Sequence, residues 1–160
     1  MDLDRFRLAV EAKDLTAMAA ALAPDVVFYS PVRQRPYRGR DEVARLFAAL
    51  MEVFVDFHYV DELAGPARHG RLEPATREAS QALVFRARIG EKPLDGVDLL
   101  RIDEHGNVVE FSVLVRPLPA AVVLARMVSA RMGTDIGWPA ASASDASETV
   151  GHSPAAAAVR

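Results

Sequence analysis

Residues 94–117 read LDGVDLLRIDEHGNVVEFSVLVRP, and this stretch decides the fold. β-Branched and aliphatic residues dominate 97–103 and 108–116. The polar EHGN segment at 104–107 lies between them and contains Gly and Asn, which tolerate a positive φ. The pattern predicts two antiparallel strands joined by a four-residue loop.

Side-chain alternation places one set of hairpin residues on a single face of the sheet. With a four-residue loop, the pairs on that face are Ile102 with Val109, Leu100 with Phe111 and Asp98 with Val113, and Val115 lies beside them. All of these residues are apolar except Asp98. Its carboxyl group either reaches water or a hydrogen bond near the strand end, or lies protonated in a cavity, because burial raises a carboxyl pKa. A protonated acid of this kind can donate a hydrogen bond to a ligand oxygen.

The opposite face of the hairpin has a mixed composition. It pairs Arg101 with Glu110 and Leu99 with Ser112, and Leu114 lies next to them. A face that carries both apolar and charged residues suits solvent or a partner subunit. We therefore expect a homodimer formed through the outer face of the sheet.

The composition of the whole chain narrows the class of protein. A chain of 160 residues suits one domain, and 51% of its residues are hydrophobic. No apolar run approaches the roughly 20 residues that span a membrane, and the N-terminus lacks a signal-peptide pattern, so we expect a cytoplasmic protein without a membrane partner. The absence of cysteine removes thiolate metal sites and cysteine nucleophiles, and the net charge of −3 argues against nucleic acid as a partner. No zinc-like cluster, P-loop or dinucleotide motif is present, so we expect neither metal nor cofactor.

Hydrophobic periodicity predicts the remaining elements. Asp2 and Asp14 are expected N-caps of two short leading helices, and a half-buried strand is expected to place His58 on the side opposite Phe57 and Tyr59. The expected helices lie near 3–10 and 15–22 and over 41–53 and 118–132, and the further strands over 26–30, 55–64 and 80–89.

Three segments are predicted to lack regular structure. Residues 65–79 contain several Gly and Pro residues and are expected to form a long charged connection. Residues 32–40 contain four arginines and are either an anion site or a solvated loop, of which we favour the loop. Residues 133–160 are rich in Ala and Ser and are expected to be a disordered tail after a domain that covers 1–132.

The element order indicates an α+β fold. We expect a curved, mostly antiparallel sheet wrapped around the N-terminal helices and one long helix, which leaves a cone with an open, apolar end. The segments FYSPV (28–32), YRGRDEVARLF (37–47) and GVDLLRIDEHGNVVEFSVLVRPL (96–118) resemble the NTF2-like, or SnoaL-like, cone folds over about residues 3–132. The resemblance implies the fold and a pocket but no single reaction, because such folds support unrelated activities.

The ketosteroid isomerase family within this superfamily allows a comparison residue by residue. Its helix-1 tyrosine falls on Phe6, its general-base aspartate on Ser30 and its oxyanion-hole aspartate on Asp98. Phe6 has no hydroxyl group and Ser30 cannot act as a carboxylate base, so that isomerase mechanism is not expected here. SnoaL-type polyketide cyclases are similar in needing an acid or base in the pocket, which Asp98 could supply, whereas the Arg-Asp-Asp group of limonene epoxide hydrolase-like members has no counterpart in this sequence.

These observations lead to two hypotheses about function. The first is a cyclase- or isomerase-like enzyme that acts through Asp98 on an apolar polycyclic or carbonyl compound. The second is a non-catalytic ligand-binding or dimerisation module. Besides Asp98, the residues expected to contact a small apolar ligand are Phe6, Phe28, Ser30, Phe47, Met51, Leu100, Phe111 and Val113.

Overall fold

The computed structural model describes residues 3–69 and 73–133. Its four helices are α1 (Asp4–Glu11), α2 (Leu15–Ala20), α3 (Arg40–Val53) and α4 (Leu118–Met132). Its strands are β1 (Leu22–Tyr29), β2 (Tyr37–Arg38), β3 (Phe54–His69), β4 (Glu73–Ile89), β5 (Lys92–Ile102) and β6 (Val108–Arg116). The expected tail lies outside the described residues, apart from Gly133.

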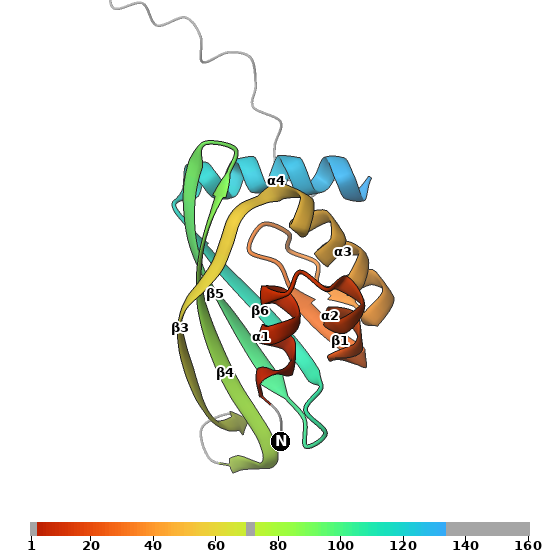
Figure 1. The fold of residues 1–160 in the computed structure, drawn as a ribbon. Helices are drawn as coiled ribbons and strands as arrows, with labels where there is room; N and C mark the ends of the chain where they lie inside the picture. The colour runs from red at the N-terminus through yellow and green to blue at the C-terminus, as the bar shows by residue number, and fades with distance from the viewer. Residues whose placement is uncertain (1–2, 70–72, 134–160) are drawn as a thin grey trace, which may run out of the picture.

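The six strands form one curved sheet in the order β2-β1-β6-β5-β4-β3. All neighbouring pairs are antiparallel except β1 and β6, which run parallel. Helices α1, α2 and α3 lie against one face of the sheet, and α4 lies across one end (Figure 1). The expected α+β fold with a curved, mostly antiparallel sheet is confirmed.

Local sequence signals explain where the helices begin and end. The Asp14 carboxylate accepts a hydrogen bond from the Ala17 backbone N–H at 2.9 Å, so the expected N-cap of α2 is confirmed. Helix α1 begins after Leu3 without a side-chain cap, and Asp2 lies outside the described residues. Helix α4 follows Pro117 and ends at Gly133, whose φ of 62° places it in the left-handed region that glycine tolerates.

The hairpin that decides the fold follows the predicted alternation with one correction. Leu100 pairs with Phe111, Asp98 with Val113 and Arg101 with Glu110, as expected. A register shift after Arg101 then pairs Ile102 with Val108 instead of Val109. Val108 is consequently buried and Val109 only half-buried, because the bulge moves the inward-facing position by one residue.

The predicted connection over 65–79 is wrong. Strand β3 continues to His69 and β4 begins at Glu73, so the two form one long hairpin. Pro66 pairs with Ala79 within this hairpin. Strand β3 lies at the edge of the sheet, with no strand on its outer side. A proline is tolerated there because an N–H on the outer side would have no strand to bond.

Another bulge, near Asp56 in β3, changes which aromatic residues face the helices. Asp56 has a φ of 53°, and the register shifts between Val55 and His58. Val55 is therefore exposed, although strict alternation would put it on the same face as Phe57, while Phe54 and Phe57 both contact Phe85. The bulge thus brings two phenylalanine rings to the inner face of one edge strand.

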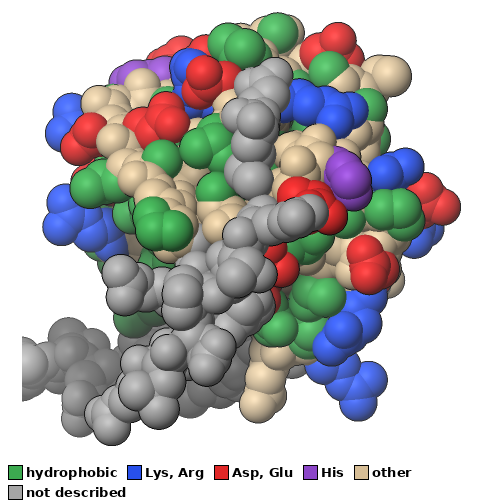
Figure 2. All heavy atoms as spheres, turned by 90° about the horizontal axis from the view of Figure 1, so that it is seen from below, with side chains coloured by type: hydrophobic (Ala, Val, Ile, Leu, Met, Phe, Trp, Pro, Cys, Tyr) green, Lys and Arg blue, Asp and Glu red, His purple; other side chains and the backbone are tan. Residues whose placement is uncertain are grey.

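The molecular surface mixes charges of both signs. Figure 2 views the molecule from below, and its coloured residues show acidic and basic side chains interspersed with hydrophobic ones. No continuous basic surface, of the kind that binds nucleic acid, is visible on the described part of this face. None of the described helices combines the length and the apolar character that a bilayer crossing requires.

Candidate functional site

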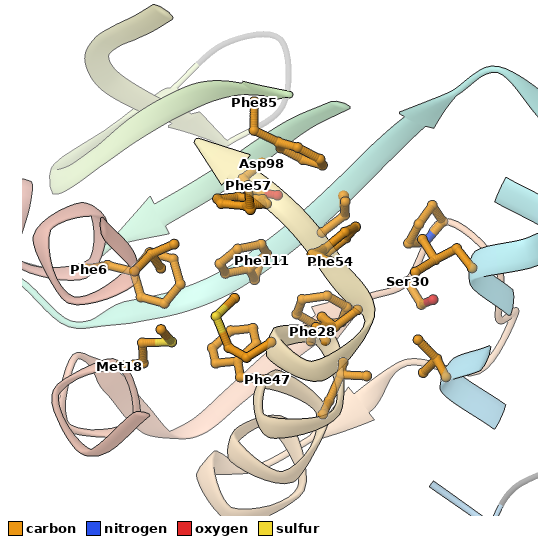
Figure 3. Close-up of a pocket in the computed structure, with 18 of the residues that line it drawn as sticks. Phe6, Met18, Phe28, Ser30, Phe47, Phe54, Phe57, Phe85, Asp98 and Phe111 are labelled. Atoms are coloured by element: carbon orange, nitrogen blue, oxygen red, sulfur yellow. The ribbon is translucent and has the colours of Figure 1, made fainter. Parts of the chain in front are cut away.

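A small cavity lies inside the cone, between the inner face of the sheet and helices α3 and α4 (Figure 3). Every helix and every strand except β2 contributes to its wall. The space that water-sized molecules can reach is about 60 Å³. The wall contains all seven phenylalanines of the chain, namely Phe6, Phe28, Phe47, Phe54, Phe57, Phe85 and Phe111.

The aromatic rings pack against one another and fix the shape of the wall. Phe111 lies at the centre, with its ring centroid 5.0 Å from that of Phe28 and 5.2 Å from that of Phe6. Phe57 stacks on Phe85 at 4.9 Å. Aromatic pairs at these distances contribute about 0.5–1.5 kcal/mol each beyond their buried area, so the wall has a defined geometry.

Gly96 makes room for one of these rings. It lies opposite Phe85 on the neighbouring strand, and a Cβ atom built on Gly96 would lie 2.2 Å from the Phe85 Cζ atom. Any side chain at position 96 would therefore displace the ring. The glycine two residues before Asp98 has a packing role, which allows Phe85 to cover the backbone of β5.

Among the residues that the structure describes, Asp98 is the one carboxyl group on the cavity wall. Its side chain projects from β5 to the inner face, between Leu83 on β4 and Val113 on β6, and only 6% of the residue is exposed. The Tyr59 hydroxyl group donates a hydrogen bond to Asp98 Oδ2 at 2.9 Å. Burial raises the pKa of Asp98 from 3.8 to about 7, although the hydrogen bond from Tyr59 acts in the opposite direction.

Tyr59 is held in its neutral form by the same surroundings. Burial raises the pKa of its hydroxyl group well above the usual 10, and the charge of Asp98 and the hydrogen bond to it act in the same direction. The tyrosine therefore remains a proton donor while Asp98 exchanges a proton near neutral pH. None of the described residues on the cavity wall is Lys, Arg or His, so no cation there favours the ionised carboxylate.

Ser30 lies at a different part of the wall. It follows the last residue of β1, and its Oγ atom accepts a hydrogen bond from the Val32 backbone N–H at 3.2 Å. Figure 3 shows Ser30 apart from Asp98, with the rings of Phe28 and Phe54 between them. The cavity thus has two separate polar points in an otherwise apolar wall.

The structure brings most of the predicted site residues together. The cavity wall includes Asp98, Phe6, Phe28, Ser30, Phe47, Met51, Phe111 and Val113. Leu100 does not line the cavity, which differs from the prediction. It lies further along β5, between Gln81 and Phe111, where it is 1% exposed and belongs to the core. His58 is exposed on the side opposite the cavity, as expected, and its Nδ1 atom lies 2.8 Å from the Asp56 carbonyl oxygen.

Tyr59 is the polar site residue that is not among the predicted contacts, and Phe54, Phe57 and Phe85 are wall residues that are not among them either. Strand alternation puts Tyr59 on the same face as Phe57, but it does not connect the tyrosine hydroxyl group with Asp98. The available signal was the combination of a tyrosine and an acid at inward positions of two strands of one sheet, because a buried tyrosine hydroxyl group usually has a hydrogen-bond partner.

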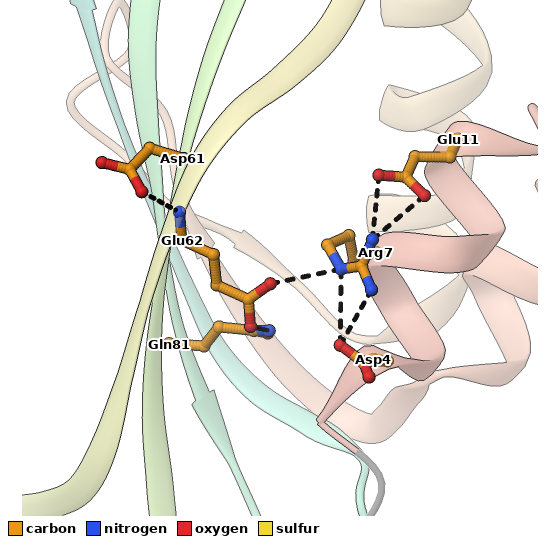
Figure 4. Close-up of polar contacts among 6 residues, drawn as sticks. All are labelled: Asp4, Arg7, Glu11, Asp61, Glu62 and Gln81. Atoms are coloured by element: carbon orange, nitrogen blue, oxygen red, sulfur yellow. Dashed lines mark hydrogen bonds and ion pairs between the residues drawn. The ribbon is translucent and has the colours of Figure 1, made fainter.

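An ion-pair cluster fastens α1 to the sheet beside the cavity (Figure 4). Arg7 contacts Asp4 and Glu11 on its own helix at 3.0 Å, and its Nε atom lies 3.3 Å from Glu62 Oε2 on β3. Gln81 Nε2 donates to Glu62 Oε1 at 2.7 Å. The cluster joins α1, which carries Phe6, to β3, which carries Tyr59.

Two arginines of the segment 32–40 have structural roles. The Arg33 guanidinium group lies 4.2 Å from the centre of the Tyr37 ring, and Arg40 donates two hydrogen bonds to the Leu22 carbonyl oxygen. These contacts fasten the loop that follows Ser30. Within the described ranges, no group of three or more His, Asp or Glu residues is arranged to hold a metal ion.

Solved structures of two bacterial proteins are similar to this chain over most of its length. A steroid delta-isomerase from Pseudomonas aeruginosa is 33% identical, with a TM-score of 0.69, over 82% of this chain and 88% of that one. An uncharacterised protein with a cystatin-like fold from Silicibacter pomeroyi is 30% identical, with a TM-score of 0.69, over 82% of this chain and 84% of that one.

A more distant structure shares the fold alone. The Orange Carotenoid Protein of Anabaena, solved with canthaxanthin, is 14% identical, with a TM-score of 0.53, over 71% of this chain and 35% of that one. No protein of curated function matches the chain.

The family comparison covers most of the described fold. The SnoaL-like domain family matches residues 3–111, which include the leading helices, the first five strands and the beginning of β6. Helix α4, which completes the cavity wall, follows the matched region. The chain belongs to the SnoaL-like family of NTF2-like cone folds.

Proposed function

We propose that this protein binds a small apolar compound with a carbonyl oxygen and that Asp98 transfers a proton to that oxygen. The observation that carries the proposal is a buried acid with a pKa of about 7 and a single tyrosine partner, in a cavity lined by seven phenylalanines. An acid whose pKa lies near the working pH is suited to general acid–base catalysis. The absence of a cation from the described wall favours a neutral ligand over a carboxylate or phosphate.

The reaction class that fits is isomerase- or cyclase-like. Asp98 would give its proton to the carbonyl oxygen while electrons shift toward that oxygen, and the resulting carboxylate would later take a proton from the substrate. The atoms of the substrate are then only rearranged, so no oxidant or cofactor is needed. Tyr59 would stabilise the transient carboxylate through its hydrogen bond.

The resemblance to the steroid delta-isomerase supports this reaction class but not the same catalytic residues. Phe6 lines the cavity without a hydroxyl group. In the sequence comparison with the ketosteroid isomerase family, the base position falls on Ser30. The described wall contains one carboxyl group rather than two. The space of about 60 Å³ is smaller than the roughly 150 Å³ of a cavity that admits benzene, so a ring compound would enter only when wall side chains such as Met51 move.

The experiment measures hydrogen–deuterium exchange next to the carbonyl group of 2-decalone in heavy water by NMR. We expect the protein to accelerate exchange and Asp98→Asn to abolish the acceleration while the ketone still binds, because asparagine can donate a hydrogen bond but cannot transfer the proton. The matched control is Asp95→Asn, which makes the same change at a half-exposed position of β5. Binding without accelerated exchange would instead support the non-catalytic binding module.

We also propose that two copies associate through the outer face of the sheet. Leu99 and Leu114 are 40% and 57% exposed on the face opposite the helices, beside the Arg101–Glu110 ion pair. An apolar surface that no helix covers is typical of an isologous interface. Light scattering at micromolar concentration is expected to give twice the chain mass, and a monomeric mass would contradict the interface.

A further inference from the structure

The cavity comes closest to solvent at Pro31, directly after β1. Of the described residues that line the cavity, Pro31 is the one that is exposed, and its neighbours Ser30 and Val32 are half-buried wall residues. By contrast, the two residues through which α4 contributes to the wall, Leu124 and Val128, are 3% and 4% exposed. A path from solvent into the cavity is therefore shortest through the segment that follows β1.

This segment, residues 30–36, has few backbone contacts. Pro31 and Pro36 lack an N–H group, and the Val32 N–H donates to the Ser30 hydroxyl group within the segment. No backbone–backbone hydrogen bond joins residues 31–36 to another part of the chain that the structure describes. The other described wall residues belong to helices or to strands of the sheet. A segment with so few hydrogen bonds opens locally at a lower free-energy cost than a helix or a paired strand.

The side chain of Arg33 connects the segment with two fixed elements. Its guanidinium group lies 4.2 Å from the centre of the Tyr37 ring on β2, and its Nη1 atom lies 3.8 Å from Glu42 Oε1 in the first turn of α3. Tyr37 is 1% exposed, and Glu42 Oε2 accepts a hydrogen bond from the Arg38 N–H at 2.8 Å. Both partners are thus held in place, and Arg33 fastens the segment to them.

The contacts of Arg33 are incomplete. Its Nη1 atom is buried but has no hydrogen-bond partner among the described residues, since 3.8 Å is too long for a hydrogen bond. A buried donor without an acceptor is unfavourable, whereas water would satisfy it if the segment moved outward. The contact with the ring and the attraction to Glu42 favour the closed position, and the unmet donor opposes it. This balance keeps the closed and open positions close in free energy.

We infer that residues 30–36 form a gate of the cavity and that Arg33 is its latch, so that a small molecule enters when Arg33 leaves Tyr37 and Glu42. The inference rests on the proposed function only in that the cavity takes up a molecule from solution. The closed cavity offers about 60 Å³, which is too little for a ring compound, so some part of the wall has to move. Outward movement of Pro31 and Val32 would both enlarge the cavity and connect it with solvent.

The test uses an engineered cysteine inside the cavity, because the chain has none of its own. Met51→Cys places a thiol group on the cavity wall, and its alkylation by iodoacetamide is followed by mass spectrometry. When the gate closes faster than the thiol reacts, the labelling rate is proportional to the population of the open form. The measurement needs no ligand, so its result is independent of Asp98 and of ketone binding.

Arg33→Ala in the Met51→Cys protein is expected to accelerate labelling about tenfold, because the contact with the Tyr37 ring and the attraction to Glu42 are both lost. Glu42→Gln retains an acceptor for the Arg38 N–H and should give a smaller acceleration. The matched control is Arg35→Ala, which makes the same change at an exposed position of the same segment and should leave the rate unchanged. An unchanged rate in Arg33→Ala would overturn the inference.

Two further variants separate the gate from other ways of opening. Arg131→Ala breaks the 3.0 Å ion pair between α4 and Glu52 on α3, and an acceleration as large as that of Arg33→Ala would overturn the inference, because α4 would then open the cavity. Val108→Cys lies in the core and does not line the cavity. Its labelling should be slower than that of Met51→Cys and should rise steeply with urea, whereas gate opening exposes little surface and should depend little on urea.

Equal labelling rates and equal urea dependence at the two cysteines would mean that only global unfolding admits the reagent, and would overturn the gate. A Met51→Cys thiol that reacts as fast as a free thiol would overturn it as well, because the cavity would then be open at all times. If Arg33→Ala accelerates labelling as expected but no ketone binds the unmodified protein, the gate stands and the proposed ligand is refuted.

Discussion

Asp98→Asn is expected to change how the stability of the fold depends on pH. The folded-state pKa of Asp98 is about 7 and the ordinary value is 3.8, so between these values the folded protein holds a proton that the unfolded chain has released. The free energy of unfolding therefore falls as the pH rises through this window and levels off above pH 7. Between about pH 5 and pH 8.5, this contribution amounts to a loss of about 3 kcal/mol. Asparagine cannot ionise, so the variant lacks this loss.

The assay is urea denaturation of the unmodified protein and of Asp98→Asn at several pH values. Near pH 5 the two should have similar stability, because asparagine and a protonated aspartic acid are alike in size and both donate a hydrogen bond. Near pH 8.5 the variant should be more stable. A carbon-detected NMR titration of the Asp98 carboxyl group checks the cause, and Tyr59→Phe should raise its midpoint because the hydrogen bond from Tyr59 lowers the pKa. A midpoint near 3.8 and a pH-independent stability difference would refute the reasoning.

Three further perturbations test the packing, a helix cap and the assembly. Gly96→Ala should destabilise the fold by about 1–3 kcal/mol, because the added methyl group overlaps the Phe85 ring. In the same denaturation assay, the control Gly65→Ala should have a much smaller effect, because no atom lies within 4 Å of its added carbon. Asp14→Ala should cost about 1 kcal/mol through loss of the α2 cap, and an unchanged denaturation midpoint would contradict that role. Leu114→Glu should convert the proposed dimer to a monomer in light scattering, and a persistent dimer would exclude this face as the interface.

The sequence allowed the central hairpin to be predicted because alternation and loop length act locally. Asp98, Leu100 and Phe111 have the expected pairing. The bulge that brings Val108 inward was not predictable. The regular register would bury Val109 and the bulged register buries Val108, so the apolar pattern does not distinguish them. The extension of the β3–β4 hairpin was missed because Gly65 and Pro66 are typical of a loop. The sequence does not reveal that β3 is an edge strand, where a proline is tolerated.

The candidate site was only partly predictable for a related reason. Asp98 was recognisable as an acid on an apolar strand face, which is a property of one hairpin. Its contact with Tyr59 joins residues on β5 and β3, two strands that are not neighbours in the sheet. Leu100 was wrongly assigned to the cavity because alternation gives the face of a residue but not its depth along the cone.

The parallel pairing of β1 with β6 has a consequence for the newly synthesised chain. Phe28 pairs with Phe111, across about half of the sequence, so β1 has no parallel neighbour until the ribosome has released β6. Until then the phenylalanines of the N-terminal half remain accessible to water and to other nascent chains. Sheets with such long-range contacts fold slowly, and their incomplete forms tend to aggregate. We therefore expect the residues that form the apolar interior of the finished protein to be the ones through which the incomplete chain aggregates.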